Sequence, residues 1–449
     1  MDKEELRVLE KIKPLKCETE TVMDFVEGLV EVAKTIARPF SAEPQIVGSI
    51  AKDTFLRGDY DIDLFIVFRE KVPRKSLEEH GLLIGTSITE KMGGTYNIKY
   101  AEHPYVRAKV GKYKIDIVPC YEIRKGEAIV SAVDRSPLHT RYIGEKLKGY
   151  RKDHARLMKY LCKKLGIYGA DAKTEGVSGY LCELFIIQFG TFRAALEILA
   201  KTPFGGYIDA EGISSEKAAR KMFRDALIVI DPTDKNRNVA APLSAQNFMR
   251  LRLEAKRYLK TGKFPNPRHP ARNLLIEKLQ EDRGTTFTGL RFDPPDIIAE
   301  NLYPQLRRLE GKLVRYLGEN DFPVVRHHSW TDEKENAYVI VEVERHALSK
   351  YKRQEGPDIF SGEVGNFLKK YLDNKYKPYI EKGRFFVCAK RRFLNVETAI
   401  RAFLKERFEE IPKSIAEKDI RVMDGGEIAK IVNGNNALNA SIVRRVFSV

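Results

Sequence analysis

The chain has 449 residues, too many for one ordinary hydrophobic core, so we expect three or four domains. Apolar residues make up 43% and charged residues 32% of the sequence, a composition typical of a soluble folded protein and not of a disordered one. The 79 lysines and arginines exceed the 63 acids by 16, which favours a polyanionic partner, either nucleic acid or an anionic membrane surface. No run of 18 apolar residues is present and the first residues lack the apolar core of a secretory signal, so we expect neither a membrane span nor export.

The basic residues are spread in clusters along the whole chain and do not form one strongly basic amphipathic helix. This distribution favours a large, irregular polyanion such as a folded RNA over a membrane. The five cysteines lie far apart and include no C-x-x-C pair, so we expect reduced thiols in a cytoplasmic protein and no structural zinc.

Residues 1–145 alternate helical and strand signals, which indicates an α/β or α+β domain. Apolar spacings of three and four predict a helix over Glu18–Phe40. The pair Gly111-Lys112 predicts a hairpin turn. The strand-forming runs are Gln45–Val47, Asp61–Phe68, Tyr105–Lys109 and Tyr113–Pro119.

Two carboxylates, Asp61 and Asp63, begin the second of these strands. Alternation with period two places both on one face, a few ångströms apart. Like charges so close repel each other and raise one pKa unless a cation lies between them, and a hard divalent ion such as Mg²⁺ suits oxygen ligands.

A third acid, Asp116, is flanked by isoleucines on another predicted strand, where a carboxylate needs a partner or a metal. If the strands are neighbours, three carboxylates converge, as a two-metal phosphoryl-transfer site requires. Gly48-Ser49 follows a short strand, and at a strand-to-helix turn its free backbone N–H groups can cradle a phosphate.

Strand signals almost vanish over residues 146–262, so we expect a helical domain there. Lys152–Leu165 is predicted to be one helix. Ser178 can cap a second, long helix whose apolar stripe runs from Leu181 to Phe192.

The remainder, residues 263–449, starts with a run of helix breakers at Pro265–Arg272 that is typical of a linker. Its mixed signals predict a small α+β unit of the ferredoxin or RNA-recognition type. The predicted elements are helices at Ile297–Leu317 and Val396–Phe408 and strands at Ala337–Arg345 and Arg384–Lys390.

Basic clusters with interleaved aromatic residues recur in this part, and together they indicate recognition of RNA shape and backbone. The clusters are Arg268–Arg272, Arg307-Arg308, Arg345–Arg353 and Lys390–Arg392, and the aromatic residues are Tyr303, Tyr316 and Tyr351.

The Gly48-Ser49 pair, eleven residues before Asp61-Ile62-Asp63-Leu64, resembles the signature of the polymerase-β-like nucleotidyltransferase superfamily. Four further segments resemble, more narrowly, the class I, archaeal-type CCA-adding enzymes, the tRNA nucleotidyltransferases that build the 3′-terminal CCA. These segments are Ser136–Ile143, Arg156–Asp171, Gly176–Ile186 and Asp231–Ala241.

The resemblance implies an α+β multidomain fold: a polymerase-β-like nucleotidyltransferase head with a mixed sheet, a helical neck, and a ferredoxin- or RRM-like C-terminal body with a tail. It also implies template-independent addition of C, C and A to tRNA from CTP and ATP, with Mg²⁺ as cofactor and pyrophosphate released. Such an enzyme processes and repairs the 3′ end of tRNA in the cytoplasm and binds the 3′ acceptor end and top half, and a homodimer is compatible with it.

By similarity, Asp61 and Asp63 ligate both metal ions, while Asp116 ligates one and helps to activate the RNA 3′-hydroxyl. Gly48 and Ser49 then belong to the nucleotide site. Three further residues match positions that hold the incoming nucleotide, although each alone favours an ordinary structural role: His139, Lys159 and Tyr168.

Lys52 and Arg237 complete this set. Lys52 is expected to contact the triphosphate, and as a lysine it lacks the guanidinium fork that the family often has at this position. Arg237 lies among turn-forming residues, where an exposed charge is the ordinary interpretation, but the family's base-reading arginine falls in this segment. A guanidinium has only hydrogen-bond donors, so it can donate to cytosine N3 and adenine N1, which are acceptors. Uracil N3 and guanine N1 carry a hydrogen and cannot accept, so these two bases are disfavoured.

Two other functions remain open. A poly(A) polymerase or an oligoadenylate synthetase shares the same superfamily signature and adds adenylate without stopping at three nucleotides. A non-catalytic RNA-binding protein on this fold is the alternative of another class, and the presence of all three carboxylates with Gly48-Ser49 disfavours it.

Overall fold

The computed structural model describes residues 1–100, 102–123, 127, 129–265 and 275–447. The chain forms two compact units, Met1–Pro267 and Arg268–Val449, and each is described by itself below. The predicted linker Pro265–Arg272, and with it the first basic cluster, lies almost wholly outside the described residues.

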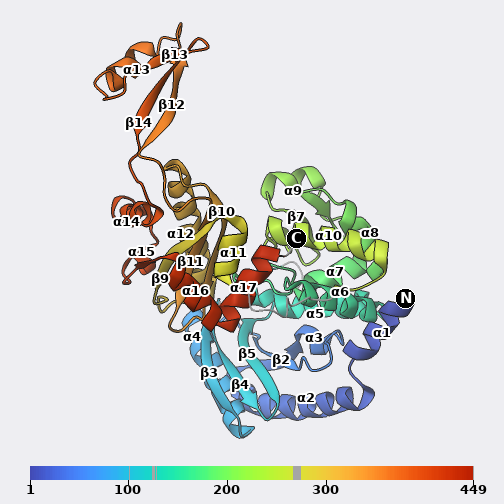
Figure 1. The fold of residues 1–449 in the computed structure, drawn as a ribbon. Coiled ribbons are helices and arrows are strands. Elements are labelled where there is room, and N and C mark those ends of the chain that lie inside the picture. Colours follow the sequence, from blue (N-terminus) through green and yellow to red (C-terminus); the bar gives the residue numbers. More distant parts are fainter. Residues whose placement is uncertain (101, 124–126, 128, 266–274, 448–449) are drawn as a thin grey trace. The chain divides into compact units, whose positions relative to one another are not determined.

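The N-terminal part of the first unit contains a five-stranded mixed sheet (Figure 1). Its strand order is β1-β2-β5-β4-β3, and only the β2–β5 pair is parallel. Apolar residues of α2 and α4 join those of the strands in one core, which explains the period-three-and-four pattern of the first predicted helix. The elements are α1 (Lys3–Ile12), α2 (Lys16–Ala37), η1 (Arg38–Phe40), β1 (Ala42–Val47), α3 (Gly48–Ala51), β2 (Asp61–Phe68), α4 (Arg74–Lys91), β3 (Thr95–Tyr100), β4 (Pro104–Val110) and β5 (Tyr113–Tyr121).

The four predicted strands are present, and Gly111 lies in the turn between β4 and β5 with φ of +57°. The edge strand β3 was not predicted, although its Thr-Tyr-Asn-Ile-Lys-Tyr alternation is a strand pattern. All six of its residues are exposed, so no buried face marks it out.

The rest of the first unit is mainly helical, and most of its helices share one apolar core (Figure 1). Two expectations are wrong here. The single long helix after Ser178 is two helices, because Gly190 ends the first with φ of +85°. The region also holds a three-stranded sheet, β6-β7-β8, whose central strand is the buried Leu-Ile-Val-Ile-Asp run. The elements are η2 (Ala132–Asp134), α5 (Arg135–Lys146), α6 (Arg151–Leu165), α7 (Gly179–Phe189), α8 (Phe192–Lys201), β6 (Gly206–Ile208), α9 (Glu216–Met222), β7 (Leu227–Asp231), β8 (Asp234–Asn238) and α10 (Ala245–Thr261).

A four-stranded antiparallel sheet of order β10-β11-β9-β15 is the centre of the second unit. Its chain order, β9-α12-β10-β11-α14-β15, is the ferredoxin-like βαββαβ pattern, as the sequence predicts. The elements are α11 (Ile276–Arg283), β9 (Thr286–Phe292), α12 (Ala299–Glu319), β10 (Val324–Thr331), β11 (Ala337–Val343), α14 (Val396–Glu406), η3 (Phe408–Glu410), α15 (Lys413–Ala416), β15 (Arg421–Met423), α16 (Gly425–Gly434) and α17 (Asn436–Phe447).

Between β11 and α14 the chain forms a separate three-stranded sheet of order β12-β14-β13 with a short helix (Figure 1). The elements are β12 (Tyr351–Asp358), α13 (Val364–Tyr371), β13 (Tyr379–Glu381) and β14 (Arg384–Lys390).

Two of the aromatic residues expected among the RNA-facing basic clusters are instead buried. Tyr303 is 9% exposed and donates to Glu333, and Tyr316 is 4% exposed and donates to Glu406. Both lie on α12, where helical spacing turns them inward. No helix in the described parts of the chain is long and apolar enough to cross a membrane.

Candidate active site

The parallel pairing of β2 with β5 sets the position of the three acids. In its register Asp63 lies directly opposite Asp116, and Asp61 precedes Asp63 by two residues on the same face. The antiparallel pairing of β5 with β4 then places Arg107 opposite Asp116. Asp63, Asp116 and Arg107 therefore form one row across three neighbouring strands.

The negative charges around Asp63 are only partly balanced by positive side chains. Burial raises the pKa of Asp63 to about 7, and the charges of Asp116 and Asp61 add to the effect. Lys52 and Arg107 oppose it only in part. A carboxyl group in this state binds a cation in place of a proton when one is offered.

The turn after β1 approaches Asp63 so closely that only glycine fits. Gly48 has φ of +72°, and a Cβ atom built on it would lie 1.9 Å from Oδ2 of Asp63. β1 ends at Val47 and α3 begins at Gly48, so the Gly-Ser pair lies at a strand-to-helix junction, as the sequence predicts, and the backbone of Gly48 lies against the carboxylate of Asp63.

We expect Gly48→Ala to destabilise the ion-free protein more than Gly58→Ala does. Gly58 also has a left-handed φ, +81°, but an added Cβ meets nothing within 4 Å, so it reports the backbone strain alone. That strain costs about 1–2 kcal/mol, and displacement of Asp63 adds roughly 1–3 kcal/mol at position 48. Thermal unfolding of the two variants measures the difference, and equal losses would show that Asp63 yields freely.

The carboxylate of Asp116 is engaged by Arg107. Nε and Nη2 of Arg107 donate to the two oxygens of Asp116 at 2.7 and 2.6 Å. Within the described ranges, no three His, Cys, Asp or Glu side chains are grouped closely enough to hold a metal ion, so Asp61, Asp63 and Asp116 are not gathered into a ready metal site. The donor set itself fits a hard divalent cation, because it consists of carboxylate oxygens, one of which has a raised pKa. The fit requires Asp116 to leave Arg107.

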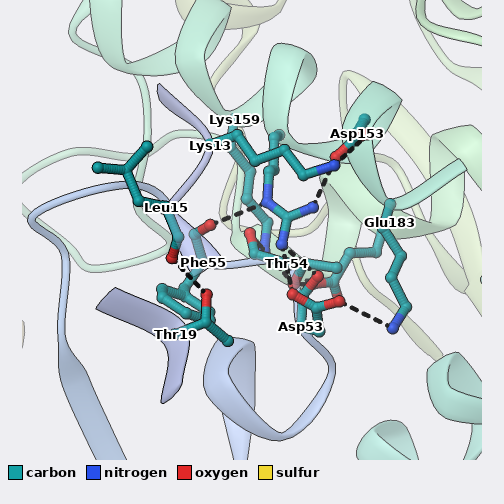
Figure 2. Close-up of polar contacts among 11 residues, drawn as sticks. Lys13, Leu15, Thr19, Asp53, Thr54, Phe55, Asp153, Lys159 and Glu183 are labelled. Carbon is teal, nitrogen blue, oxygen red and sulfur yellow. Dashed lines mark hydrogen bonds and ion pairs between the residues drawn. The ribbon is translucent and has the colours of Figure 1, made fainter. Parts of the chain in front are cut away.

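A buried ion cluster on the neighbouring α6 and α7 fixes the loop after α3. Glu183 accepts from Lys52 at 3.0 Å and from Lys159 at 2.7 Å, and Thr54 also donates to it. Figure 2 shows Lys159, Thr54 and Glu183 converging. Lys159 and Glu183 are 2% and 1% exposed.

The neighbours of Glu183 hold its carboxylate ionised. Burial alone would raise the pKa of Glu183, but the charges of Lys159 and Lys52 and hydrogen bonds from Lys159 and Thr54 lower it to about 2. Lys159 also donates to the carbonyl and hydroxyl of Thr54, so its three protons all have acceptors inside the protein. The amino groups of Lys52 and Lys159 therefore share one carboxylate, while burial lowers the pKa of Lys159.

A second buried carboxylate, Asp231 at the end of β7, gathers the other predicted nucleotide residues. It lies 2.8 Å from Nε2 of His139 and accepts from Arg237 at 2.7 Å and from Tyr180 at 3.1 Å. Burial alone would raise the pKa of Asp231, but the hydrogen bonds from His139, Thr233 and Arg237 hold it well below its usual value. Burial lowers the pKa of His139, which favours the neutral ring.

The two clusters adjoin through Tyr180. Its ring stacks on His139 with centroids 3.9 Å apart, and Nζ of Lys52 lies 5.4 Å from its centroid. Tyr168 lies beside Lys159, since a Cβ on Gly179 would meet the Tyr168 hydroxyl at 2.8 Å and Cε of Lys159 at 3.5 Å. Ser49 lies in α3, and its carbonyl accepts from the Thr54 amide.

The predicted residues thus lie in one neighbourhood of the first unit, while their roles stay predictions. A cavity of about 460 Å³ lies at the other ends of β1 and β2, away from the acids, and none of the predicted site residues lines it.

Arg237 lies on β8 and not in the loop that its turn-forming neighbours suggested.

Sequence reasoning missed four side chains of this site. Glu183, Tyr180 and Asp231 all stand inside segments that carry the resemblance, so the segments pointed to them without giving a role. Arg107 could have been found from its place opposite Asp116 in the predicted hairpin.

Three family models match successive parts of the chain. They describe a nucleotidyltransferase domain over residues 26–139, the second domain of tRNA nucleotidyltransferase over 153–265 and the C-terminal domain of the CCA-adding enzyme over 283–423.

Archaeal relatives match nearly end to end. The CCA-adding enzyme of Methanocaldococcus jannaschii is 34% identical over 93% of this chain and 94% of its own. That of Halobacterium salinarum is 36% identical over 88% and 86%. Among solved structures, one of Cid1, with RNA terminal uridylyl transferase activity, covers 59% of this chain and 94% of its own at 15% identity and a TM-score of 0.46.

Proposed function

The chain belongs to the family of CCA-adding enzymes and is a nucleotidyltransferase that adds C, C and A to tRNA; we propose that it does so without a template, through Asp61, Asp63 and Asp116. The observation that carries the assignment of these residues is the row in which Asp63 and Asp116 lie opposite each other on parallel strands, against the backbone of Gly48.

Enzymes of this fold generally use divalent metal ions, and we assign Mg²⁺ to the row of acids. Asp61 and Asp63 would hold both ions and Asp116 one. When bound, such ions would supply a lower pKa for the RNA 3′-hydroxyl and a counter-charge for the triphosphate and the departing pyrophosphate. Gly48 keeps the chain close to Asp63, so the amides of Gly48 and Ser49 would be available to phosphate oxygens beside such ions.

The buried lysines supply the charge for the triphosphate. Lys52 and Lys159 share one carboxylate, and we assign to this cluster the positive charge that a triphosphate beside the acids needs. We assign the triphosphate contact to Lys52, which bonds to Glu183 and whose ammonium also lies beside the Tyr180 ring. Lys159, whose donors are all used, positions Thr54 and Glu183 beneath it, with Tyr168 alongside.

We assign base selection to Arg237. Asp231 holds one guanidinium nitrogen, and the side chain is 33% exposed, so the remaining donors can meet cytosine N3 or adenine N1. The neutral His139 and the Tyr180 ring hold the same carboxylate from its other side.

Arg237→Ala should reduce the preference for CTP and ATP over UTP and GTP by roughly 10- to 100-fold, the value of one or two hydrogen bonds to a charged donor. The matched control is Lys235→Ala, which removes an exposed charge from the same strand. Single-nucleotide incorporation with each triphosphate measures the ratio. An unchanged preference in Arg237→Ala would remove this assignment.

The remaining assignments concern partners and organisation. We propose that the protein acts in the cytoplasm, where it binds the 3′ acceptor end and top half of tRNA, and that the chain can form a homodimer. We also propose three domains: a catalytic head (residues 1–145), a neck (146–262) and an RNA-binding body and tail (263–449). The excess of 16 positive charges supports an RNA partner.

The test of the function is extension of a tRNA that lacks its CCA end, with CTP, ATP and Mg²⁺. We expect addition to stop after three nucleotides. A long adenylate tail would favour a poly(A) polymerase or oligoadenylate synthetase, and no incorporation at all would favour a non-catalytic RNA-binding protein.

A further inference from the structure

Arg107 makes a fork-shaped ion pair with an acid that the proposed reaction needs for another purpose. Its Nε and Nη2 take one oxygen of Asp116 each, at 2.7 and 2.6 Å. The side chains of Arg107 and Asp116 are 47% and 25% exposed, so the pair is not required to fill the core. A pair that is this open contributes little to stability.

The pair occupies the place of a cation. Three acids lie in one neighbourhood, and the positive charges of Lys52 and Arg107 act on Asp63 against those of its acidic neighbours. An ion coordinated by Asp116 needs the same carboxylate oxygens that Arg107 holds. A guanidinium and a divalent ion on one carboxylate also repel each other, so binding of one weakens binding of the other.

Arg107 also contacts Tyr105, and this contact does not depend on Asp116. Nη2 donates to the Tyr105 hydroxyl at 3.0 Å, and the guanidinium carbon lies 5.7 Å from the centroid of that ring. Tyr105 lies two residues earlier on β4 and therefore on the same face. The side chain can shift from the acid to the ring without leaving the strand surface.

We propose that Arg107 is a positioning residue that takes the cation's place on Asp116 while the site is empty and gives up the carboxylate when a divalent ion binds. The affinity for the ion is then set by competition with Arg107. This inference rests on the proposed function, because it takes Asp116 to be a metal ligand.

The test is the binding of Mn²⁺ alone to the full chain, followed by electron paramagnetic resonance in the absence of RNA and nucleotide. We expect Arg107→Met to bind Mn²⁺ at least fivefold more tightly than the wild type. The matched control is Lys109→Met, which removes a positive charge from the same strand and face two residues away, and which we expect to change affinity less than twofold. Equal affinities in the two variants would overturn the proposal.

A double-variant cycle separates competition from general charge. In an Asp116→Asn background Arg107 has no carboxylate to withhold, so Arg107→Met should no longer tighten binding. If it tightens binding as much as before, Arg107 acts at a distance and the proposal is wrong. If circular dichroism shows that Arg107→Met does not fold, Arg107→Lys replaces it in the test. Arg107→Lys keeps the positive charge but loses the two-pronged guanidinium contact, and it should bind Mn²⁺ more tightly than the wild type.

Failure of the underlying function gives a different result. If Asp63→Asn binds Mn²⁺ as tightly as the wild type, the acids are not the metal site, whatever Arg107→Met does. If Asp63→Asn loses Mn²⁺ and Arg107→Met equals Lys109→Met, the metal site stands and only the role of Arg107 falls.

Discussion

Asp63→Asn should lose nucleotide addition by at least roughly 10³-fold, as removal of a central catalytic group does, while the ion-free protein becomes more stable above pH 7. The two effects have one cause. The carboxylate lies against Gly48 and opposite Asp116. In this position its negative charge destabilises the fold unless a cation is bound, and the same charge is needed to bind the cation. Asparagine keeps the shape and removes the charge.

The stability effect has a defined pH window. The pKa of Asp63 is about 7 in the folded protein because of burial and the charges of Asp116 and Asp61, against about 3.9 in an unfolded chain. Between these values the folded state binds more protons, so wild-type stability falls as pH rises through the window. The loss amounts to roughly 4 kcal/mol at most, and it should vanish in Asp63→Asn.

Hydrogen exchange of the β2 amides at pH 5 and pH 8 measures this loss where it arises. Mg²⁺ should restore protection at pH 8 in the wild type and not in the variant. Asp59→Asn is the matched control, since this acid precedes the strand and pairs with Lys163. A wild type whose protection is the same at both pH values would show that Asp63 is already paired.

Local sequence patterns predicted the head because its signals are local. The alternation that starts at Asp61, the glycine after β1 and the hairpin at Gly111 each depend on neighbours within a few residues, and all appear in the structure. The ferredoxin-like order of the second unit follows from the same kind of signal.

What sequence patterns could not show is which distant side chains pair. Glu183 and Lys52 are 131 residues apart, and nothing around either indicates the other. The break at Gly190 was missed because the apolar stripe continues across it into α8. Arg107 is a different case, because it lies only nine residues from Asp116 and the predicted hairpin already places the two opposite each other.

Glu183→Gln should destabilise the first unit by roughly 3–5 kcal/mol, because it leaves two buried ammonium groups without a counter-charge. Lys159 and Lys52 are 2% and 9% exposed, and glutamine supplies one acceptor of similar shape but no charge. The single tryptophan, Trp330, lies in the second unit, so its fluorescence does not report this change. Hydrogen exchange of the α6 and α7 amides does.

The matched control removes one of the two charges that Glu183 balances. In the double variant Glu183→Gln, Lys159→Met, only Lys52 keeps a buried charge, and a flexible apolar chain fills the space of the other lysine. We therefore expect the double variant to recover more than half of the lost protection. If Glu183→Gln alone stays within about 1 kcal/mol of the wild type, the lysines do not depend on Glu183. The loop from Lys52 to Phe55 would then be held by Arg156, which donates to Asp53 and to the carbonyl of Phe55.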